Sequence, residues 1–210
     1  MIETKKKDWN DLADRKQQIL EVASEIFSKT GYYETSMKDV AQKAGIAVGT
    51  IYIYYKNKEE LLDGIYKYAS TLLLDQIKKK IATVSDPLER LHIFISESIQ
   101  FGFNHPYYFL IVFVDFRRKA VEFPNSVTYK FFHEYLAMGG AILNEGKNAG
   151  LLNFPDNQDV IFGITGFWGA YVLREILTPH PGKNSKKKKQ DHIQTIFEDT
   201  ILKGLKTNRI

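Results

Sequence analysis

The stretch that decides the fold is AGIAVGTIYIYYKNKEEL, which runs from Ala44 to Leu61. Gly45 permits a tight turn because glycine tolerates positive φ values. Residues 48–55 then show a short helical pattern with one apolar side. The segment from Asn57 to Glu60 resembles a capping box with Asn as its first residue, and it predicts the start of another helix. The stretch therefore predicts a helix that ends at Ala44, a turn, a short helix, and a long helix.

The residues before this stretch predict two more elements of the same unit. A helix over about Asp14 to Lys29 has apolar residues at helical spacing on one face, and Gly31 is placed to end it. A second helix begins at Ser36, a favourable N-cap, with Asp39 three residues on. Its buried face is predicted to consist of Met37, Val40, Ala41 and Ala44. The three helices predict a helix-turn-helix unit.

The polar and small residues of this unit suit a DNA contact. The hydroxyl groups of Thr35 and Ser36 lie at a helix start, where backbone N–H groups favour a phosphate. Small residues at the head of the last short helix allow close approach to a groove, and hydroxyl or ammonium groups can donate to phosphates. The predicted DNA contacts are Thr35, Ser36, Met37, Ala47, Val48, Gly49, Thr50, Tyr52, Ile53, Tyr54 and Lys58.

Each polar contact has a structural alternative. Ser36 could serve only as an N-cap, Lys58 could be a solvated residue at a helix start, and Tyr55 fits the core better than a DNA contact. Residues 1–68 carry eleven Lys/Arg and eleven Asp/Glu. Any attraction to DNA must therefore come from the arrangement of charges, not from their sum.

From about Arg15 to Asp63 the sequence resembles the DNA-binding domain of the TetR family of bacterial transcriptional regulators. The matching segments are ILEVASEIFSKTGYYETSMKDVAQKAG, GTIYIYY and KNKEELL. The resemblance implies Thr35 and Ser36 as phosphate contacts and Val48 and Gly49 at base edges. It also implies a larger C-terminal domain that binds a ligand and forms a homodimer.

Composition sets the class of protein. The chain has 210 residues, no cysteine, 44% hydrophobic and 26% charged residues, and a formal net charge of +4. These values indicate an ordinary globular protein of a reducing cytoplasm, with neither a disulfide scaffold nor a thiolate metal site. The first residues have no apolar signal segment, and no apolar run is long enough to suggest a membrane partner. No phosphate loop, nucleophile motif or metal-spaced histidine pair indicates an enzyme, a metal site or a cofactor.

The whole chain reads as all-α, with about nine helices. Residues 1–62 are predicted to form the helix-turn-helix domain, and residues 63–210 the larger ligand-binding and dimerisation domain. Proline and glycine positions divide the second part into helices from about Pro87 to Asn104, onward to Lys119, from Phe123–Pro124 to about Gly146, and from Pro155–Asp156 to Leu177. Residues 178–190, including the Lys186–Lys189 run, are predicted to be a solvated loop, followed by a last helix over about Asp191 to Lys206.

Aromatic residues concentrate between positions 101 and 135, with more between 162 and 171. Such side chains, together with a few polar groups, suit an apolar or aromatic effector. The predicted effector contacts are Phe101, Asn104, His105, Tyr108, Phe113, Phe116, Phe132, Tyr135 and Trp168. The alternative is that these aromatic residues form the core.

Two helices are predicted to form the dimer interface. The helix from Gln158 to Leu177 carries small residues at a spacing that allows another helix to approach closely, and the last helix is amphipathic. The predicted interface residues are Gly163, Gly166, Phe167, Ala170, Ile193, Phe197 and Ile201. The alternative is packing within the chain.

The sequence thus predicts a cytoplasmic repressor that binds a palindromic operator as a homodimer and is released by a small apolar effector. Two heads must match half-sites about one helical turn (34–36 Å) or a multiple apart. An effector that favours another spacing lowers affinity for DNA. The alternatives are an enzyme, or a helical interaction module of the same fold that acts without an effector or as an activator.

Overall fold

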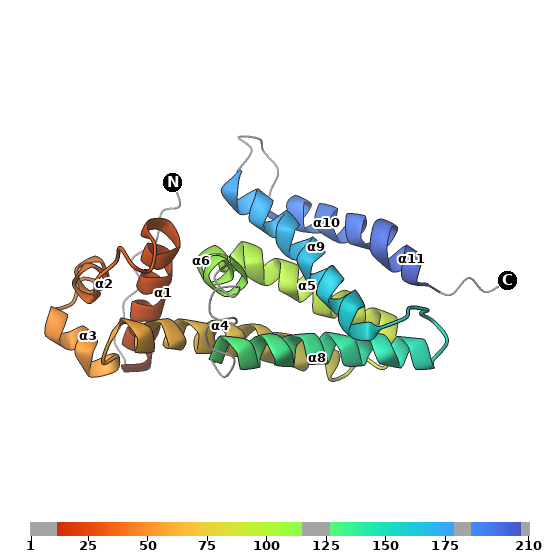
Figure 1. Ribbon diagram of the computed structural model, residues 1–210, viewed down its shortest axis with the longest axis horizontal. Helices are drawn as coiled ribbons and strands as arrows, with labels where there is room; N and C mark the ends of the chain where they lie inside the picture. The colour runs from red at the N-terminus through yellow and green to blue at the C-terminus, as the bar shows by residue number, and fades with distance from the viewer. Residues whose placement is uncertain (1–11, 115–126, 179–185, 207–210) are drawn as a thin grey trace. The chain divides into compact units, whose positions relative to one another are not determined.

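The computed structural model describes residues 12–114, 127–178 and 186–206 (Figure 1). These residues are helical apart from short connections, which confirms the predicted all-α class. The α-helices are α1 (Leu12–Thr30), α2 (Met37–Ala44), α3 (Val48–Tyr54), α4 (Lys58–Ile81), α5 (Pro87–Asn104), α6 (Pro106–Phe109), α8 (Val127–Asn148), α9 (Asn157–Leu177), α10 (Lys186–Phe197) and α11 (Lys203–Leu205). Two π-helical segments, Leu110–Val114 and Glu198–Leu202, continue α6 and α10.

The chain divides into two compact units, Met1–Lys67 and Tyr68–Ile210. The division falls inside α4, five residues beyond the boundary predicted between residues 62 and 63. Because helix α4 runs without a break from Lys58 to Ile81, no change in the local sequence pattern marks this point. Whether the units act as separate functional domains stays a prediction.

In the N-terminal unit, α1 packs against α2 and α2 against α3. Ser36 caps α2 as predicted: its side chain accepts from the Asp39 backbone N–H, and the Asp39 carboxylate accepts from the Ser36 backbone. Gly45 ends α2 in the left-handed region at φ 68°, where its N–H bonds back to Ala41 and Gln42. Local sequence therefore sets both ends of α2 and the direction in which α3 departs.

In the C-terminal unit, α5 is the central helix and contacts α8, α9 and α10, as can be followed in Figure 1. Asp86 caps α5 ahead of Pro87, and Asp156 caps α9. Gly102 and Gly139 lie where a Cβ would overlap Val172 and Ile161, respectively. These glycines allow α5 and α8 to approach α9 closely.

The prediction of a loop over residues 186–190 is wrong, because α10 begins at Lys186 and the four lysines form its first turn. Lysines at a helix N-terminus oppose the helix dipole, so the local sequence does not favour a helix start at this point. Here Lys189 forms an ion pair with Glu175 of α9, with 2.9 Å between Nζ and Oε2. One helix is predicted to end near Lys119 and the next to start at Phe123–Pro124. Both of these positions lie outside the described residues.

Candidate nucleic-acid interface

Helix α3 exposes large apolar and aromatic side chains to solvent. Val48 is 41% exposed, Tyr52 49% and Ile53 78%. Ala47 and Gly49, on either side of Val48, are exposed as well, while Thr50 and Tyr54 are half-buried. A helix with a slim leading end and this much uncovered surface has the form that enters a DNA major groove.

The opposite side of α3 is firmly anchored. Ile51 is completely buried and Tyr55 is 3% exposed. The Tyr55 ring packs where a Cβ on Gly64 of α4 would be, so a glycine on α4 permits this close contact. Burial raises the pKa of the Tyr55 hydroxyl above its ordinary value, with the Glu60 charge acting in the same direction. Tyr55 is therefore a core residue, in line with the preferred interpretation of its sequence.

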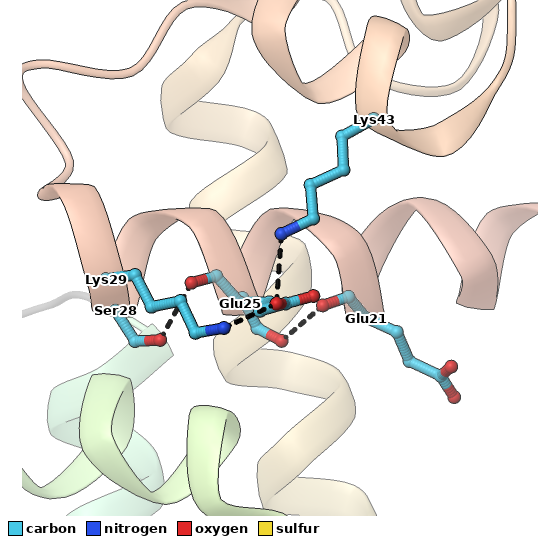
Figure 2. A network of polar contacts seen from close by, with 6 residues as sticks. Glu21, Glu25, Ser28, Lys29 and Lys43 are labelled. Carbon is cyan, nitrogen blue, oxygen red and sulfur yellow. Dashed lines mark hydrogen bonds and ion pairs between the residues drawn. The ribbon is translucent and has the colours of Figure 1, made fainter. Parts of the chain in front are cut away.

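Helix α2, which supports α3, is tied to α1 by polar contacts. Gln18 donates to the carbonyl of Ala44 at 3.2 Å, at the end of α2. Glu25 of α1 pairs with Lys29, one turn along, and with Lys43 of α2, at 2.7 and 3.0 Å (Figure 2). Burial opposes the ionisation of Glu25, but the two ammonium groups outweigh it and hold the pKa of Glu25 below its ordinary value.

The hydroxyl groups predicted to bind phosphate are engaged inside the unit. Thr35 is 3% exposed, and its hydroxyl donates to the carbonyl of Gly31 at 2.7 Å. The Ser36 hydroxyl donates to the Asp39 carboxylate at 2.6 Å, and hydrogen bonds from Ser36 lower the pKa of Asp39. Met37 is buried. The groups at the start of α2 that can still bind a phosphate are backbone N–H groups, because those of a first helical turn have no acceptor within the helix.

Lys58 also makes internal contacts. Its ammonium group donates to the carbonyls of Tyr32 and Thr35 at 2.6 and 2.8 Å, and to that of Tyr33 at 3.3 Å. The phosphate contact of Lys58 stays a prediction, because these carbonyls would compete with a phosphate for its ammonium group.

Two lysines outside the predicted contacts, Lys38 and Lys56, are exposed in the N-terminal unit. Lys38 is on the first turn of α2, and Lys56 is in the connection between α3 and α4. Tyr33, 67% exposed, adds a hydroxyl on the loop before α2. The sequence indicates both exposures: Lys38 lies outside the apolar stripe of α2, and Lys56 lies between the predicted core residue Tyr55 and the Asn57 cap.

The predicted effector contacts separate into two groups in the C-terminal unit. Near α6, Phe101, His105 and Tyr108 form a chain of rings with centroids 5.2 and 6.0 Å apart. In the second group, the rings of Phe113 and Trp168 have centroids 5.8 Å apart. Asn104 is exposed, Phe132 packs on the exposed Phe162, and Phe116 lies outside the described residues.

Tyr135 forms a polar point in this apolar interior. Its hydroxyl lies 2.9 Å from that of Ser98 on α5, and burial raises its pKa above the ordinary value. The indole Nε1 of Trp168 is buried without a hydrogen-bond partner among the described residues. The interior thus combines aromatic surface with a hydroxyl pair and an indole donor.

A groove of about 420 Å³ runs along one face of α4 in the C-terminal unit, lined by Tyr68, Thr71, Leu72, Asp75, Gln76 and Lys79. None of the predicted effector contacts lines this groove, although the Tyr68 ring packs on Tyr108 at 5.5 Å. Gln76 also donates to the buried carboxylate of Glu97, which pairs with Lys80 at 2.6 Å. The groove therefore lies next to a buried polar link between α4 and α5.

Helix α9 has an exposed apolar face. Phe162 is 60% and Leu177 63% exposed, and Gly163, Gly166 and Ala170 lie exposed between them. By length and composition α9 is apolar enough to cross a membrane, yet only 33% of its most apolar window is buried in this chain. The predicted dimer residues of the last helix differ: Ile193 and Phe197 are 1% and 0% exposed, so they pack inside the unit and are not available to a second chain. Ile201 is half-buried.

The fold and the exposed α3 define a helix-turn-helix DNA-binding protein. Residues 19–65 match the family model described as bacterial regulatory proteins, tetR family. The chain is 33% identical over 199 residues to the HTH-type transcriptional regulator YhgD of Bacillus subtilis, covering 93% of this chain and 98% of that one. The chain belongs to the TetR family of bacterial transcriptional regulators, which are DNA-binding proteins and not enzymes.

Solved structures have the same fold. The ketosteroid transcriptional regulator KstR2 of Mycobacterium tuberculosis matches with a TM-score of 0.79 at 23% identity, over 94% of this chain and 98% of that one. The regulator FadR of Bacillus subtilis, in complex with stearoyl-CoA, matches with a TM-score of 0.70 at 21% identity, over 86% and 96%.

Proposed function

We propose that this regulator is a homodimeric repressor that binds a palindromic operator through α3 and is released by an apolar effector. The observation that carries the DNA contact is the exposure of Val48, Tyr52 and Ile53 on a helix whose other face is fully buried. Ala47, Gly49 and Thr50 complete the leading end of the helix. These side chains suit contacts with thymine methyl groups and sugar–phosphate backbone more than polar readout of bases.

The charge for DNA binding comes from a few placed groups. Lys38 and Lys56 supply exposed ammonium groups, and the start of α2 supplies backbone N–H groups for a phosphate. Because contacts to the DNA backbone dominate over polar base contacts, specificity depends on the spacing of two reading heads and on DNA shape.

The proposed dimer surface is the exposed face of α9, with Phe162, Gly163, Gly166, Phe167 and Ala170. Small residues at this spacing let a second helix approach closely, while the large apolar residues give the contact its buried area. A long apolar helix that is only partly covered is unusual on a monomeric protein. We also propose a cytoplasmic location, which the family's role as bacterial DNA-binding regulators supports.

The proposed effector is an apolar molecule, and two features support this class. The C-terminal unit holds aromatic rings around the Tyr135 and Trp168 polar groups, and structures of the same fold belong to regulators named for a ketosteroid or solved with stearoyl-CoA. The effector acts by binding one arrangement of the two heads more tightly than the other.

The first test is DNA selection followed by gel shifts. We expect a palindromic sequence to be selected from a random library and its complex to weaken steeply as salt rises, since counterions are released on binding. A Val48→Ala variant should change the sequence preference. Failure to select any sequence would overturn the proposed DNA function.

The second test concerns the effector class. Stearoyl-CoA should weaken the operator complex and, in a Trp9→Phe variant whose remaining tryptophan is the buried Trp168, change the tryptophan fluorescence. Free coenzyme A, which has the same polar part, should do neither. A response to both compounds would assign recognition to the nucleotide part. No response to stearoyl-CoA or to a steroid would contradict the proposed effector class.

A further inference from the structure

Lys58 begins α4, and its ammonium group lies against the loop between α1 and α2. Three backbone carbonyls, those of Tyr32, Tyr33 and Thr35, accept from it at 2.6, 3.3 and 2.8 Å. These carbonyls belong to the segment that leads into Ser36, the N-cap of α2, and Thr35 is the residue immediately before it. The side chain therefore connects the first residue of α4 to the segment that sets where α2 starts.

The number of donors matches the number of acceptors. A lysine ammonium group has three N–H donors and no acceptor, and each of the three has a carbonyl within hydrogen-bonding distance. The charge also lies 4.4 Å from the centre of the Tyr32 ring, a favourable cation–π contact. With its donors used in this way, Lys58 has none left for a phosphate unless the loop first releases it.

The loop that Lys58 contacts is also restrained by local contacts. Gly31 takes a positive φ of 104°, so the chain reverses sharply at the end of α1. The Thr35 hydroxyl bonds back to Gly31, and the Tyr32 ring packs edge-on against Phe27 of α1 with centroids 5.4 Å apart. Without Lys58, three carbonyls in a partly buried loop would lose a charged donor, and such losses are costly.

We propose that Lys58 is a positioning residue for DNA binding, which fixes the start of α2, and with it α3, without itself binding a phosphate. This inference rests on the proposed function, because it assigns the role of one residue in operator binding. It differs from the role that the sequence predicted for Lys58, namely a direct phosphate contact.

Three variants separate the two roles. In Lys58→Met the charge is removed at nearly constant length, and in Lys58→Arg the charge is kept, but a planar guanidinium cannot direct its donors to three carbonyls around one point. Lys56→Met is the matched control, because Lys56 is an exposed lysine two residues away for which a direct phosphate contact is proposed.

The measurement is operator affinity as a function of salt. Both Lys58 variants should bind the operator roughly tenfold more weakly than the parent, because loss of the charged hydrogen bonds lets the start of α2 move. The slope of log K against log salt concentration should be the same as in the parent. In Lys56→Met the slope should fall in magnitude by about 0.9, the value for one lost phosphate contact. If Lys58→Arg binds as the parent does, or Lys58→Met lowers the slope as Lys56→Met does, Lys58 binds phosphate and the proposal fails.

A second readout needs no DNA. Backbone amide hydrogen exchange over residues 32–38 should be faster in both Lys58 variants than in the parent and unchanged in Lys56→Met. Parental exchange in the Lys58 variants would overturn the positioning role even if no operator is found. Conversely, faster exchange combined with no DNA binding by the parent protein would overturn the proposed function and leave the loop contact intact.

Discussion

At the scale of single residues, several polar groups of the N-terminal unit that could bind DNA form hydrogen bonds within the unit. Thr35, Ser36 and Lys58 were predicted to bind phosphates, and in the structure each makes hydrogen bonds within the unit. On α3, the side chains of Val48, Tyr52 and Ile53 are exposed, and Lys38 and Lys56 are exposed on neighbouring segments of the chain. Residue type alone did not separate these roles, because a hydroxyl or an ammonium group suits a helix cap and a phosphate equally well.

Glu25 gives a prediction about pH. Because its pKa is lowered in the folded protein, its ion pairs contribute stability above its unfolded pKa of about 4.3, and this contribution is lost as pH falls through the folded value. We expect Glu25→Gln to cost roughly 0.5 kcal/mol at pH 7, a typical value for partly exposed ion pairs.

The measurement for Glu25 is thermal unfolding of parent and variant between pH 7 and pH 3. The difference between the two melting temperatures should shrink below about pH 4.3, where the free carboxyl group takes up its proton. Lys43→Met should remove part of the same pH dependence, since Lys43 is the partner on α2. A difference that stays constant down to pH 3 would contradict this assignment.

At the scale of elements, α9 shows how one helix can face two environments. Gly169 lies on its inner side, where a methyl group would overlap the ring of Phe113. Gly163 and Gly166 lie on its outer side, and no atom of the residues that the structure describes is within 4 Å of a Cβ placed there. Glycine in the middle of a helix costs about 1 kcal/mol relative to alanine. In the proposed dimer, these exposed glycines allow the partner helix to pack closely on this face.

Alanine substitutions on α9 test this arrangement. Gly166→Ala should raise the free energy of unfolding of the monomer by about 1 kcal/mol, because alanine has the higher helix propensity. The same substitution should weaken the dimer, because the new methyl group keeps the partner helix further away. Analytical ultracentrifugation measures the second effect.

Gly169→Ala provides the comparison on the same helix. It should lower thermal stability at every protein concentration, because the clash with Phe113 is internal to the chain. A Gly166→Ala protein that dimerises as tightly as the parent would show that this face of α9 is not the interface.

At the scale of the whole molecule, DNA recognition by two reading heads depends on their separation. About 10 base pairs complete one turn of DNA, so inserting about 5 between the half-sites turns one of them to the opposite face of the duplex. We expect that insertion to weaken binding by more than an order of magnitude, with partial recovery at about 10 inserted base pairs if the protein can span the longer distance. Gel shifts with such operators measure this, and equal affinity for all spacings would contradict binding as a dimer.

The effector should show reciprocal coupling at the same scale. If it weakens operator binding by some factor, operator DNA must weaken effector binding by that factor, because both describe one thermodynamic cycle. Titrations of the effector with and without operator DNA measure the second quantity. An effector that binds equally tightly with and without operator DNA would contradict release of the operator by the effector.

The sequence by itself determined the helices whose ends depend on local chemistry. Gly45, the Ser36–Asp39 capping box and the Asp86–Pro87 and Asp156 starts all act within a few residues, so the ends of α2 and the starts of α5 and α9 were predictable. The motif from Ala44 to Leu61 also identified the family, because it combines apolar residues that pack in the core with small residues that let a helix enter a DNA groove.

Tertiary structure alone decided which of several chemically equivalent residues face outward. Lys58 and Lys56 are two residues apart and look alike in the sequence, yet one bonds to three carbonyls of a loop more than twenty residues earlier and the other is exposed. Likewise, Phe197 and Phe162 both lie on helices predicted to form the dimer interface, but only Phe162 is exposed. Their roles depend on contacts between distant segments, and local periodicity carries no information about which neighbour will cover a given face.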